Sequence, residues 1–356
     1  MAVSNTLPLE TPPSRAEEIR DYLLTLLQAG KPDSVGRAAK VFRVSRQAVN
    51  RHMRALIAQG FVKASGATRG RQYSLVVDSH TRDYDLKGLE EHVVWRDFVR
   101  PLLGDVPPNV ERIWQYGVTE MLNNAVDHSG GTSVRVEVTR VGGSVNLYVT
   151  DDGIGIFRKL REALGLEDDQ HVVLELSKGK LTTDPKNHTG EGIFFTSRIF
   201  DLFSILSGEL YLIHTPRLKD WVFEMGQNVR GTTVRLKLRG NSTKKLDDLF
   251  DLFASSDEHY RFSVTHVPVA LAKVGDDNLV SRSQARRLMA RLDLFSKVVL
   301  DFEGVNQIGQ AFADEVFRVF ANEHPQLELG WVDATENVER MIRRALAARA
   351  DKSPEA

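Results

Sequence analysis

The chain has 356 residues, of which 42% are hydrophobic and 27% charged, as in ordinary globular proteins with buried cores. It has no run of about 18 apolar residues and no basic and apolar leader, so we expect neither a membrane span nor a secretory signal. Cysteine is absent, which excludes disulfides, thiol catalysis and cysteine-bound metals and fits a cytoplasmic protein. The length allows two or three domains.

The net charge of -1 conceals an uneven distribution along the chain. Residues 14–75 carry twelve basic side chains against four acidic ones, so the remainder is acidic overall. Because a basic segment attracts polyanions, we expect nucleic acid to contact this segment alone. Residues 1–13 contain three prolines and little apolar surface, which predicts a disordered tail.

Residues 14–78 predict three short helices followed by a β-hairpin. Apolar residues recur at helical spacing over residues 15–28, and Ser34 and Ser45 are suited to cap the second and third helices. Two β-like runs then flank a turn that is rich in glycine and arginine.

This order resembles a winged helix-turn-helix domain, and the resemblance implies DNA as the partner. The recognition helix would span residues 45–59, and the hairpin would be the wing. Helix side chains would contact bases and phosphates, and wing cations would contact the phosphate backbone. The candidate DNA-binding residues are Arg46, Gln47, Asn50, Arg51, Arg54, Lys63, Arg69 and Arg71. A solvated polar face and a protein-docking module are the alternatives.

Residues 79–110 predict a connecting helix, with its centre over residues 89–103. Residues 111–240 form the longest coherent block. It predicts a helix to residue 128, a loop with a long polar stretch, and a second helix over residues 192–203. The expected strands of this block are 133–141, 144–150, 206–213, 222–225 and 232–238.

Short motifs within this block point to a nucleotide. Glu120 and Asn124 are four residues apart and therefore share one face of a helix. An amide oxygen can bind Mg²⁺ and a carboxylate can orient a water molecule or a hydroxyl, which suits a magnesium–triphosphate site. Asp151 ends a strand and could accept a hydrogen bond from an exocyclic amine such as that of adenine. Gly153 and Gly155 follow it and let the backbone approach a ligand closely.

Two further motifs complete the pattern. Gly190 and Gly192 form a Gly-x-Gly turn that opens a helix, whose free N–H groups and positive dipole end favour phosphate. A Gly-Thr pair, Gly231 and Thr232, then enters the last strand of the block. Each motif alone is common, but the four motifs in this order are specific.

This order of motifs resembles the GHKL class of proteins over about residues 111–240. The class includes gyrase-type ATPases, Hsp90 chaperones, MutL, histidine kinases and anti-sigma serine kinases. The resemblance implies an α/β sandwich of the Bergerat type that binds ATP and Mg²⁺. It assigns Glu120 as the general base, Asn124 as the Mg²⁺ ligand and Asp151 as the adenine-binding residue, with Thr232 beside it.

The same resemblance gives the glycines their roles. Gly153 and Gly155 would shape the adenine pocket, and Gly190 and Gly192 would bound the phosphate lid. The lid itself would span residues 157–189. We expect its lysines, Lys178 and Lys180, to be solvated, and contact with the γ-phosphate is the alternative.

Residues 260–350 predict an α/β domain. The expected strands are 261–264, 298–302 and 327–331, and the expected helices are 281–292, 310–320 and 336–347. The block resembles a STAS-like domain of the DUF4325 type, related in shape to anti-sigma factor antagonists. A phosphorylated serine of a STAS domain would lie at the turn 307–311, which has neither serine nor threonine. The resemblance therefore implies a packing role or a protein partner.

The fold class is thus an α/β ATP-binding domain between a winged helix and a STAS-like domain, an architecture that resembles bacterial ATP-binding proteins. Our first interpretation is a regulator of transcription that couples ATP and Mg²⁺ binding to DNA binding. The second is an anti-sigma-type protein serine/threonine kinase in which Glu120 activates a hydroxyl of another protein. The third is a plain ATPase, as a homodimeric clamp in a defence or repair system.

Overall fold

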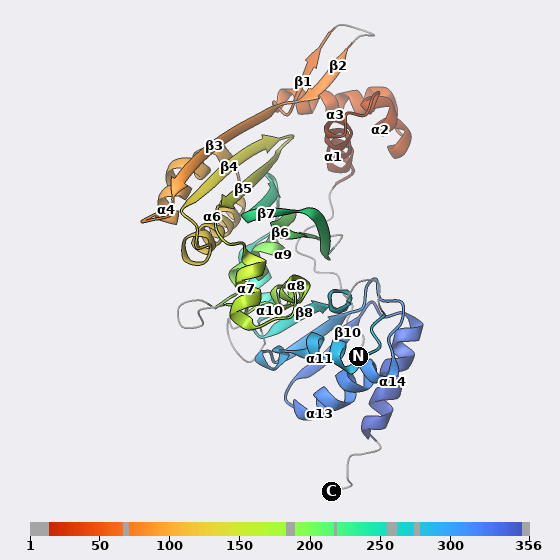
Figure 1. The fold of residues 1–356 in the computed structure, drawn as a ribbon. Helices are drawn as coiled ribbons and strands as arrows, with labels where there is room; N and C mark the ends of the chain where they lie inside the picture. The colour runs from red at the N-terminus through yellow and green to blue at the C-terminus, as the bar shows by residue number, and fades with distance from the viewer. Residues whose placement is uncertain are drawn as a thin grey trace.

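The structure, a computed structural model, describes residues 14–66, 71–182, 189–216, 219–254, 262–273 and 278–350. The expected tail, residues 1–13, lies outside this part of the chain. Figure 1 shows three units in succession, which we call the N-terminal head (residues 14–76), the central domain (77–254) and the C-terminal domain (262–350). Among the helices so described, none has both the length and the apolar character that a membrane span requires.

The N-terminal head has the three helices and the hairpin that the sequence predicts. They are α1 (Arg15–Gln28), α2 (Ser34–Phe42), α3 (Arg46–Ala58) and the antiparallel strands β1 (Val62–Ser65) and β2 (Gln72–Leu75). Ser45 caps α3 by accepting a hydrogen bond from the Ala48 amide, because a serine oxygen can satisfy a free N–H of the first turn. Leu23, Val49 and Met53 are buried and form a small separate core.

The central domain is built on an antiparallel sheet with the order β3-β4-β5-β7-β6. Its strands are β3 (Val77–Asp85), β4 (Ser133–Val141), β5 (Ser144–Asp151), β6 (Leu202–Thr215) and β7 (Lys219–Arg239). Strand β6 begins earlier than predicted, because the helix before it ends at Ile199, and β7 is one continuous strand where the sequence predicts two, 222–225 and 232–238. The two motif strands, β5 and β7, lie side by side.

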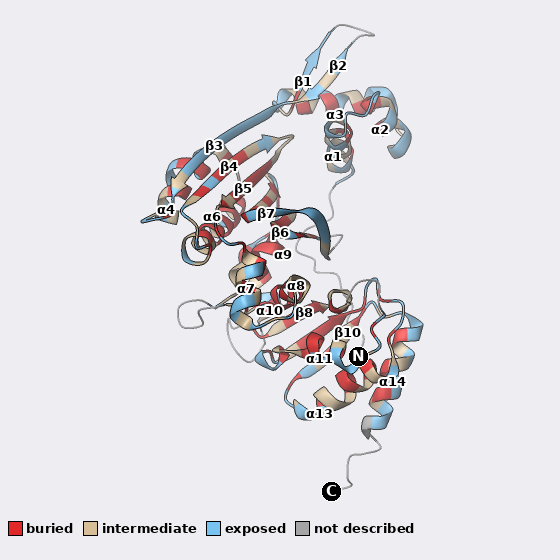
Figure 2. Cartoon of the chain, in the orientation of Figure 1, coloured by how far each residue is buried: buried red, intermediate tan, exposed pale blue. Residues whose placement is uncertain are grey.

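The predicted connecting helix over residues 79–110 is wrong in its first part. All nine residues of β3 pair with β4, and helix begins only at Glu91, in α4 (Glu91–Val94), the π-turn η2 (Trp95–Val99) and α5 (Arg100–Leu103). Strand β3 lies at the edge of the sheet and is exposed along almost its whole length, as Figure 2 shows. An exposed edge strand needs no alternating apolar side chains, so its sequence carries little strand signal.

Helices α6 (Pro108–Asn123) and α9 (Gly192–Ile199) pack together and against the sheet. Trp114 of α6 and Phe200, at the end of α9, make an edge-to-face contact with ring centroids 4.9 Å apart. A side chain at Gly117 would collide with Phe200, so glycine allows this close approach. The helix α10 (Leu246–Phe253) follows the sheet and packs on both helices.

Two helices lie where the sequence predicts a long polar stretch, and the lid stays a prediction. They are α7 (Ile156–Leu164) and α8 (Asp169–Lys178). Residues 172–179 are buried throughout, because α8 lies between α7 and α9 on one side and the C-terminal domain on the other. Figure 1 shows α8 at this boundary. Residues 183–188 of the predicted lid lie outside the described residues.

The C-terminal domain has a parallel sheet with the order β10-β9-β8. Its strands are β8 (Val264–Pro268), β9 (Lys297–Asp301) and β10 (Glu328–Val332). Its helices are η4 (Val269–Ala272), α11 (Arg282–Met289), η5 (Leu292–Leu294), α12 (Gln310–Asp314), η6 (Glu315–Phe320), α13 (Ala321–Glu323) and α14 (Glu336–Ala350). The first strand begins at Val264, where the prediction for it ended. The apolar core of this domain is continuous with that of the central domain through Phe194, Phe253 and Phe262.

Candidate nucleotide site

Glu120 of α6 faces the start of α9. A side chain at Gly192 would collide with the Glu120 carboxylate, so the predicted base and the predicted phosphate turn lie against each other. Tyr116, one helical turn before Glu120, belongs to the same region, because burial and the charges of Glu120 and Glu191 raise the pKa of its hydroxyl. This part of the site therefore gathers two carboxylates and a phenol at a helix N-terminus.

Asn124 begins the short π-helix η3 (Asn124–His128), which follows α6 directly. Although π-helices are rare, those that do occur are frequently found at functional sites. The residue after this helix, Ser129, contacts the second motif, because its carbonyl accepts a hydrogen bond from the Ile154 amide (3.1 Å). A Cβ at Gly153 would collide with the same carbonyl. The end of the Asn124 helix and the glycine loop are therefore packed backbone to backbone.

Asp151 is only 8% exposed at the end of β5. Its Oδ1 accepts hydrogen bonds from the amides of Gly153 (2.9 Å) and Thr232 (3.3 Å). Burial raises the pKa of this carboxyl, although the two amides oppose the shift. Among the described residues, both hydrogen bonds to the carboxylate go to Oδ1, which leaves Oδ2 as an acceptor for a ligand.

The fourth motif completes the surroundings of Asp151. Thr232 pairs with Asp151 across β5 and β7, and its hydroxyl accepts a hydrogen bond from the Ile156 amide (3.0 Å). Gly155 has a positive φ of 90°, which glycine adopts easily, and a side chain there would approach the Ser207 hydroxyl within 2.6 Å. Ser207, which the sequence did not indicate, donates to the Gly231 carbonyl (2.9 Å).

The third motif is held by Leu181. Leu181 donates a backbone hydrogen bond to the Gly190 carbonyl (3.2 Å). Gly190 has a φ of 72°, and a Cβ there would lie 2.6 Å from the Leu181 carbonyl carbon. Leu181 and Gly190 are therefore packed backbone to backbone.

Asp152 and Lys159 also belong to this region and were missed by sequence reasoning. The Asp152 carboxylate accepts hydrogen bonds from the amides of Ser133 (3.0 Å) and Thr132 (2.7 Å) and from the Thr132 hydroxyl (2.7 Å). Lys159 donates to the His128 carbonyl (2.5 Å). The doubled aspartate was the available signal for Asp152, whereas nothing near Lys159 in sequence distinguishes it from a surface lysine.

The predicted lysines of the lid are directed to the C-terminal domain. Lys178 is 1% exposed, so the expectation that it is solvated is wrong. It pairs with Glu175 (2.5 Å) and donates to the Ala290 carbonyl (2.8 Å) at the end of α11. Lys180 donates to the Leu294 carbonyl (2.9 Å).

The candidate DNA-binding residues lie in two parts of the N-terminal head. Arg46, Gln47, Arg51 and Arg54 are exposed on α3, and Asn50 is partly exposed on the same helix. Arg46 makes two hydrogen bonds to Asp33 (2.7 and 3.1 Å). On the hairpin, Lys63 and Arg71 are exposed, and Arg69 lies outside the described residues.

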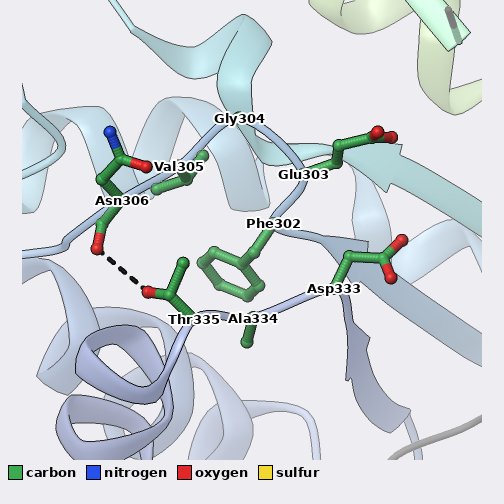
Figure 3. A pocket seen from close by; sticks show the side chains of 8 residues that line it. All are labelled: Phe302, Glu303, Gly304, Val305, Asn306, Asp333, Ala334 and Thr335. Atoms are coloured by element: carbon green, nitrogen blue, oxygen red, sulfur yellow. Dashed lines mark hydrogen bonds between the residues drawn. The ribbon is translucent and has the colours of Figure 1, made fainter.

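A hollow of about 500 Å³ opens at the carboxyl edge of the C-terminal sheet (Figure 3). Its lining residues are Phe302, Glu303, Gly304, Val305, Asn306, Asp333, Ala334 and Thr335. The carboxylates of Asp301, Glu303 and Asp333 lie within 4.8 Å of one another beside it. Acidic groups lie this close on many surfaces without an ion, so we treat the cluster as part of the surface.

Comparison with protein families identifies two of the three units. Residues 109–242 match the family described as histidine kinase-, DNA gyrase B- and HSP90-like ATPase. The chain contains a GHKL-type ATPase domain. Residues 284–339 match a STAS-like domain of unknown function. No curated protein matches the chain.

The ATPase match begins at residue 109, so strand β3 and the N-terminal head lie before it. Members of this class bind ATP, and the site fits that ligand in two respects. Asp151, which is 8% exposed, keeps its second carboxylate oxygen as an acceptor for an exocyclic amine. A Cβ at Gly153, Gly155, Gly190 or Gly192 would also collide with neighbouring atoms, so glycine allows these motifs to pack closely around Asp151 and Glu120.

Proposed function

We propose that this protein is a regulator that binds ATP and Mg²⁺ in the central domain and DNA through the N-terminal head, and that nucleotide binding changes the affinity for DNA. The ATPase match supports the nucleotide part of the proposal. The excess of basic residues in the head and the exposed arginines of α3 support the DNA part. Transcription is the process that such coupling would control.

In this proposal Asp151 accepts the adenine amine, and Thr232 holds the Asp151 carboxylate in place. Asn124 is the Mg²⁺ ligand, and Mg²⁺ would neutralise phosphate charge when bound. The turn at Gly190 and Gly192 supplies backbone N–H groups to the phosphates. Glu120, which faces Gly192, orients a water molecule or accepts its proton.

The coupling rests on the continuity of the chain from the hairpin of the head into the sheet of the central domain. The hairpin strand β2 ends at Leu75 and the sheet strand β3 begins at Val77, so only Val76 separates them. The Val76 amide donates to the Phe61 carbonyl (3.0 Å), which ties this junction to the head. A change at the sheet edge therefore has a short route to the hairpin that we assign as the wing.

Side chains also hold the head against this same end of the sheet, where Val77 pairs with Val141 and Ser144 pairs with Arg239. Leu24 of α1 packs on Gly142, and the Phe61 ring packs on Gly143, the turn between β4 and β5. Asp21 forms an ion pair with Arg239 (3.5 Å) at the end of β7. The head therefore contacts β4, β5 and β7, the strands that carry or flank Asp151 and Thr232.

The test is DNA binding by the full chain with and without a non-hydrolysable ATP analogue and Mg²⁺. Because the DNA sequence is unknown, the probe is a library of random duplexes from which bound sequences are selected. We expect the nucleotide to change the affinity roughly five- to tenfold, the range of ordinary allosteric coupling. The same affinity in both conditions would overturn the coupling, and loss of DNA binding in Arg51→Ala and Arg54→Ala would locate the contact on α3.

A further inference from the structure

The C-terminal domain contacts Lys180, the residue before Leu181. Arg291 donates to the Lys180 carbonyl (3.0 Å), and the Lys180 ammonium donates to the Leu294 carbonyl (2.9 Å). The same ammonium lies 4.7 Å from the ring centre of Phe295, a cation–π distance. Both the backbone carbonyl and the side chain of Lys180 are thus held by residues 291–295.

The next residue along the chain transfers this contact to the nucleotide site. Leu181 binds the Gly190 carbonyl, and Gly192 begins α9 against Glu120. Only one peptide bond therefore separates the residue held by the C-terminal domain from the residue that holds the phosphate turn. The charge of Lys180 also reaches that turn, because it lowers the pKa of Glu191 against the larger opposing effect of burial.

The backbone at both contact residues is strained. Lys180 has a φ of 55° and Arg291 a φ of 62°. Both values lie in the left-handed region, which residues other than glycine and asparagine rarely adopt. Such conformations persist where the surrounding contacts hold them, and they cluster at functional sites. The two strained residues are joined to each other by the hydrogen bond from Arg291 to Lys180.

Buried charges fix the rest of α8 to the same domain. Arg287 forms two hydrogen bonds with Asp168 (2.8 and 3.1 Å), and Arg291 approaches the buried Glu175 (3.5 Å). The Thr265 hydroxyl donates to the Lys178 carbonyl (2.7 Å). Because Arg287 and Glu175 are buried, separating the two domains would remove a charged partner from each of them.

We propose that Lys180 and Arg291 form a clasp by which the C-terminal domain positions the phosphate turn of the ATP site. They are positioning residues, because they act on Gly190 and Gly192 through Leu181. The C-terminal domain therefore adjusts affinity for the phosphates and leaves adenine recognition at Asp151 unchanged. The proposal rests on the nucleotide part of the proposed function and is independent of DNA binding.

Arg291→Gly tests the clasp without adding strain, because glycine adopts the left-handed conformation freely. In the full chain we expect the affinity for a non-hydrolysable ATP analogue with Mg²⁺ to fall roughly tenfold, since a hydrogen bond from a charged group is lost. The affinity for adenosine should stay within about twofold, because adenosine has no phosphate for the turn to bind. Titration calorimetry measures both.

The matched control is Asp333→Gly, which relieves the same kind of backbone strain in the same domain. Asp333 follows β10 at the carboxyl edge of the sheet, whereas Arg291 precedes β9 at the opposite edge. We expect this control to leave the ratio of the two affinities as in the wild type. Thermal unfolding of both variants checks that the fold is retained.

Lys180→Gly removes the other half of the clasp and serves as the second variant. Because Lys180→Gly keeps the carbonyl that Arg291 contacts, it removes a separate contact, and we expect it to lower the affinity for the ATP analogue and to leave that for adenosine unchanged. A loss in Lys180→Gly with none in Arg291→Gly would indicate that Lys180 touches phosphate directly and would overturn the clasp. An unchanged ratio in Arg291→Gly would overturn it as well, whereas a wild type that binds neither adenosine nor the ATP analogue would overturn the proposed function instead.

Discussion

Asp151 is a buried carboxylate whose energetic cost is explained by the ligand we assign to it. Its raised pKa means that the folded protein disfavours the charged form. Between the usual value of 3.8 and the raised value, the folded state holds more protons than the unfolded state, so stability falls as pH rises through this interval. At neutral pH the charge of Asp151 therefore lowers the stability of the folded protein. In our proposal, nucleotide recognition requires this charge.

Asp151→Asn separates these two effects. The amide oxygen can still accept hydrogen bonds from the amides of Gly153 and Thr232, but its NH₂ group now opposes a second donor. We expect adenosine affinity to fall at least roughly tenfold, as for a lost hydrogen bond with a charged group, while the melting temperature at pH 7 does not fall. Calorimetric binding and thermal unfolding at pH 4 to 8 measure both effects, and a clear drop in stability at pH 7 would contradict the assignment.

At the scale of single elements, the start of α9 and the loop after β5 depend on glycine for different reasons. At Gly192 a new methyl group meets the end of the flexible Glu120 side chain, which can move. At Gly153 it meets the Ser129 carbonyl, which is backbone and cannot move without shifting the π-helix η3. The two motifs therefore differ in what an alanine would disturb.

We expect Gly192→Ala to fold normally and bind adenosine but to lose ATP turnover, because Glu120 is displaced. Gly153→Ala should lower the free energy of unfolding by about 1–3 kcal/mol, the usual cost of overpacking, and weaken nucleotide binding. Phosphate release and chemical unfolding separate the two results. Equal destabilisation by both variants would show that Glu120 cannot move away.

The helix α8 owes its position to a buried charge network rather than to its apolar residues alone. Lys178→Met keeps the length of the side chain but leaves Glu175, which is 1% exposed, without its nearest partner. We expect a loss of about 3 kcal/mol, at the lower end for breaking a buried pair, because Arg291 remains 3.5 Å from Glu175. The measurement is chemical unfolding.

Lys297→Met is the control for this substitution, since the ion pair of Lys297 with the exposed Glu328 should contribute less than about 1 kcal/mol. If the two lysine variants unfolded at the same denaturant concentration, the buried network would not hold α8.

At the scale of the whole molecule, the chain places its ATP site between two attachments. The head is joined through Val76 and β3, and the C-terminal domain is joined through Lys180. An insertion of two glycines after Val76 should leave DNA binding and nucleotide binding intact while removing the effect of one on the other. DNA affinity with and without the ATP analogue measures this loss, and persistent coupling would assign it to the side-chain contacts of Leu24, Phe61 and Asp21.

The order of the motifs was enough to predict the central domain and the neighbourhood of Asp151. Local spacing carries that information, because Glu120 and Asn124 share a helix and Asp151 ends the strand that the glycines follow. The C-terminal α/β order was likewise readable from alternating strand and helix patterns. The DNA-binding residues remain predictions on an exposed helix face.

Other features depended on partners distant in sequence. Strand β3 is polar and was read as part of a helix, since only its pairing with β4 makes it a strand. Lys178 and Lys180 have the composition of a solvated loop, and only residues more than 100 positions later bury one and hold the other. The sequence by itself determined which residues we propose for nucleotide binding, because the motifs are local; the tertiary structure alone decided which domain packs against Lys178 and Lys180, because burial of a charge depends on what packs over it.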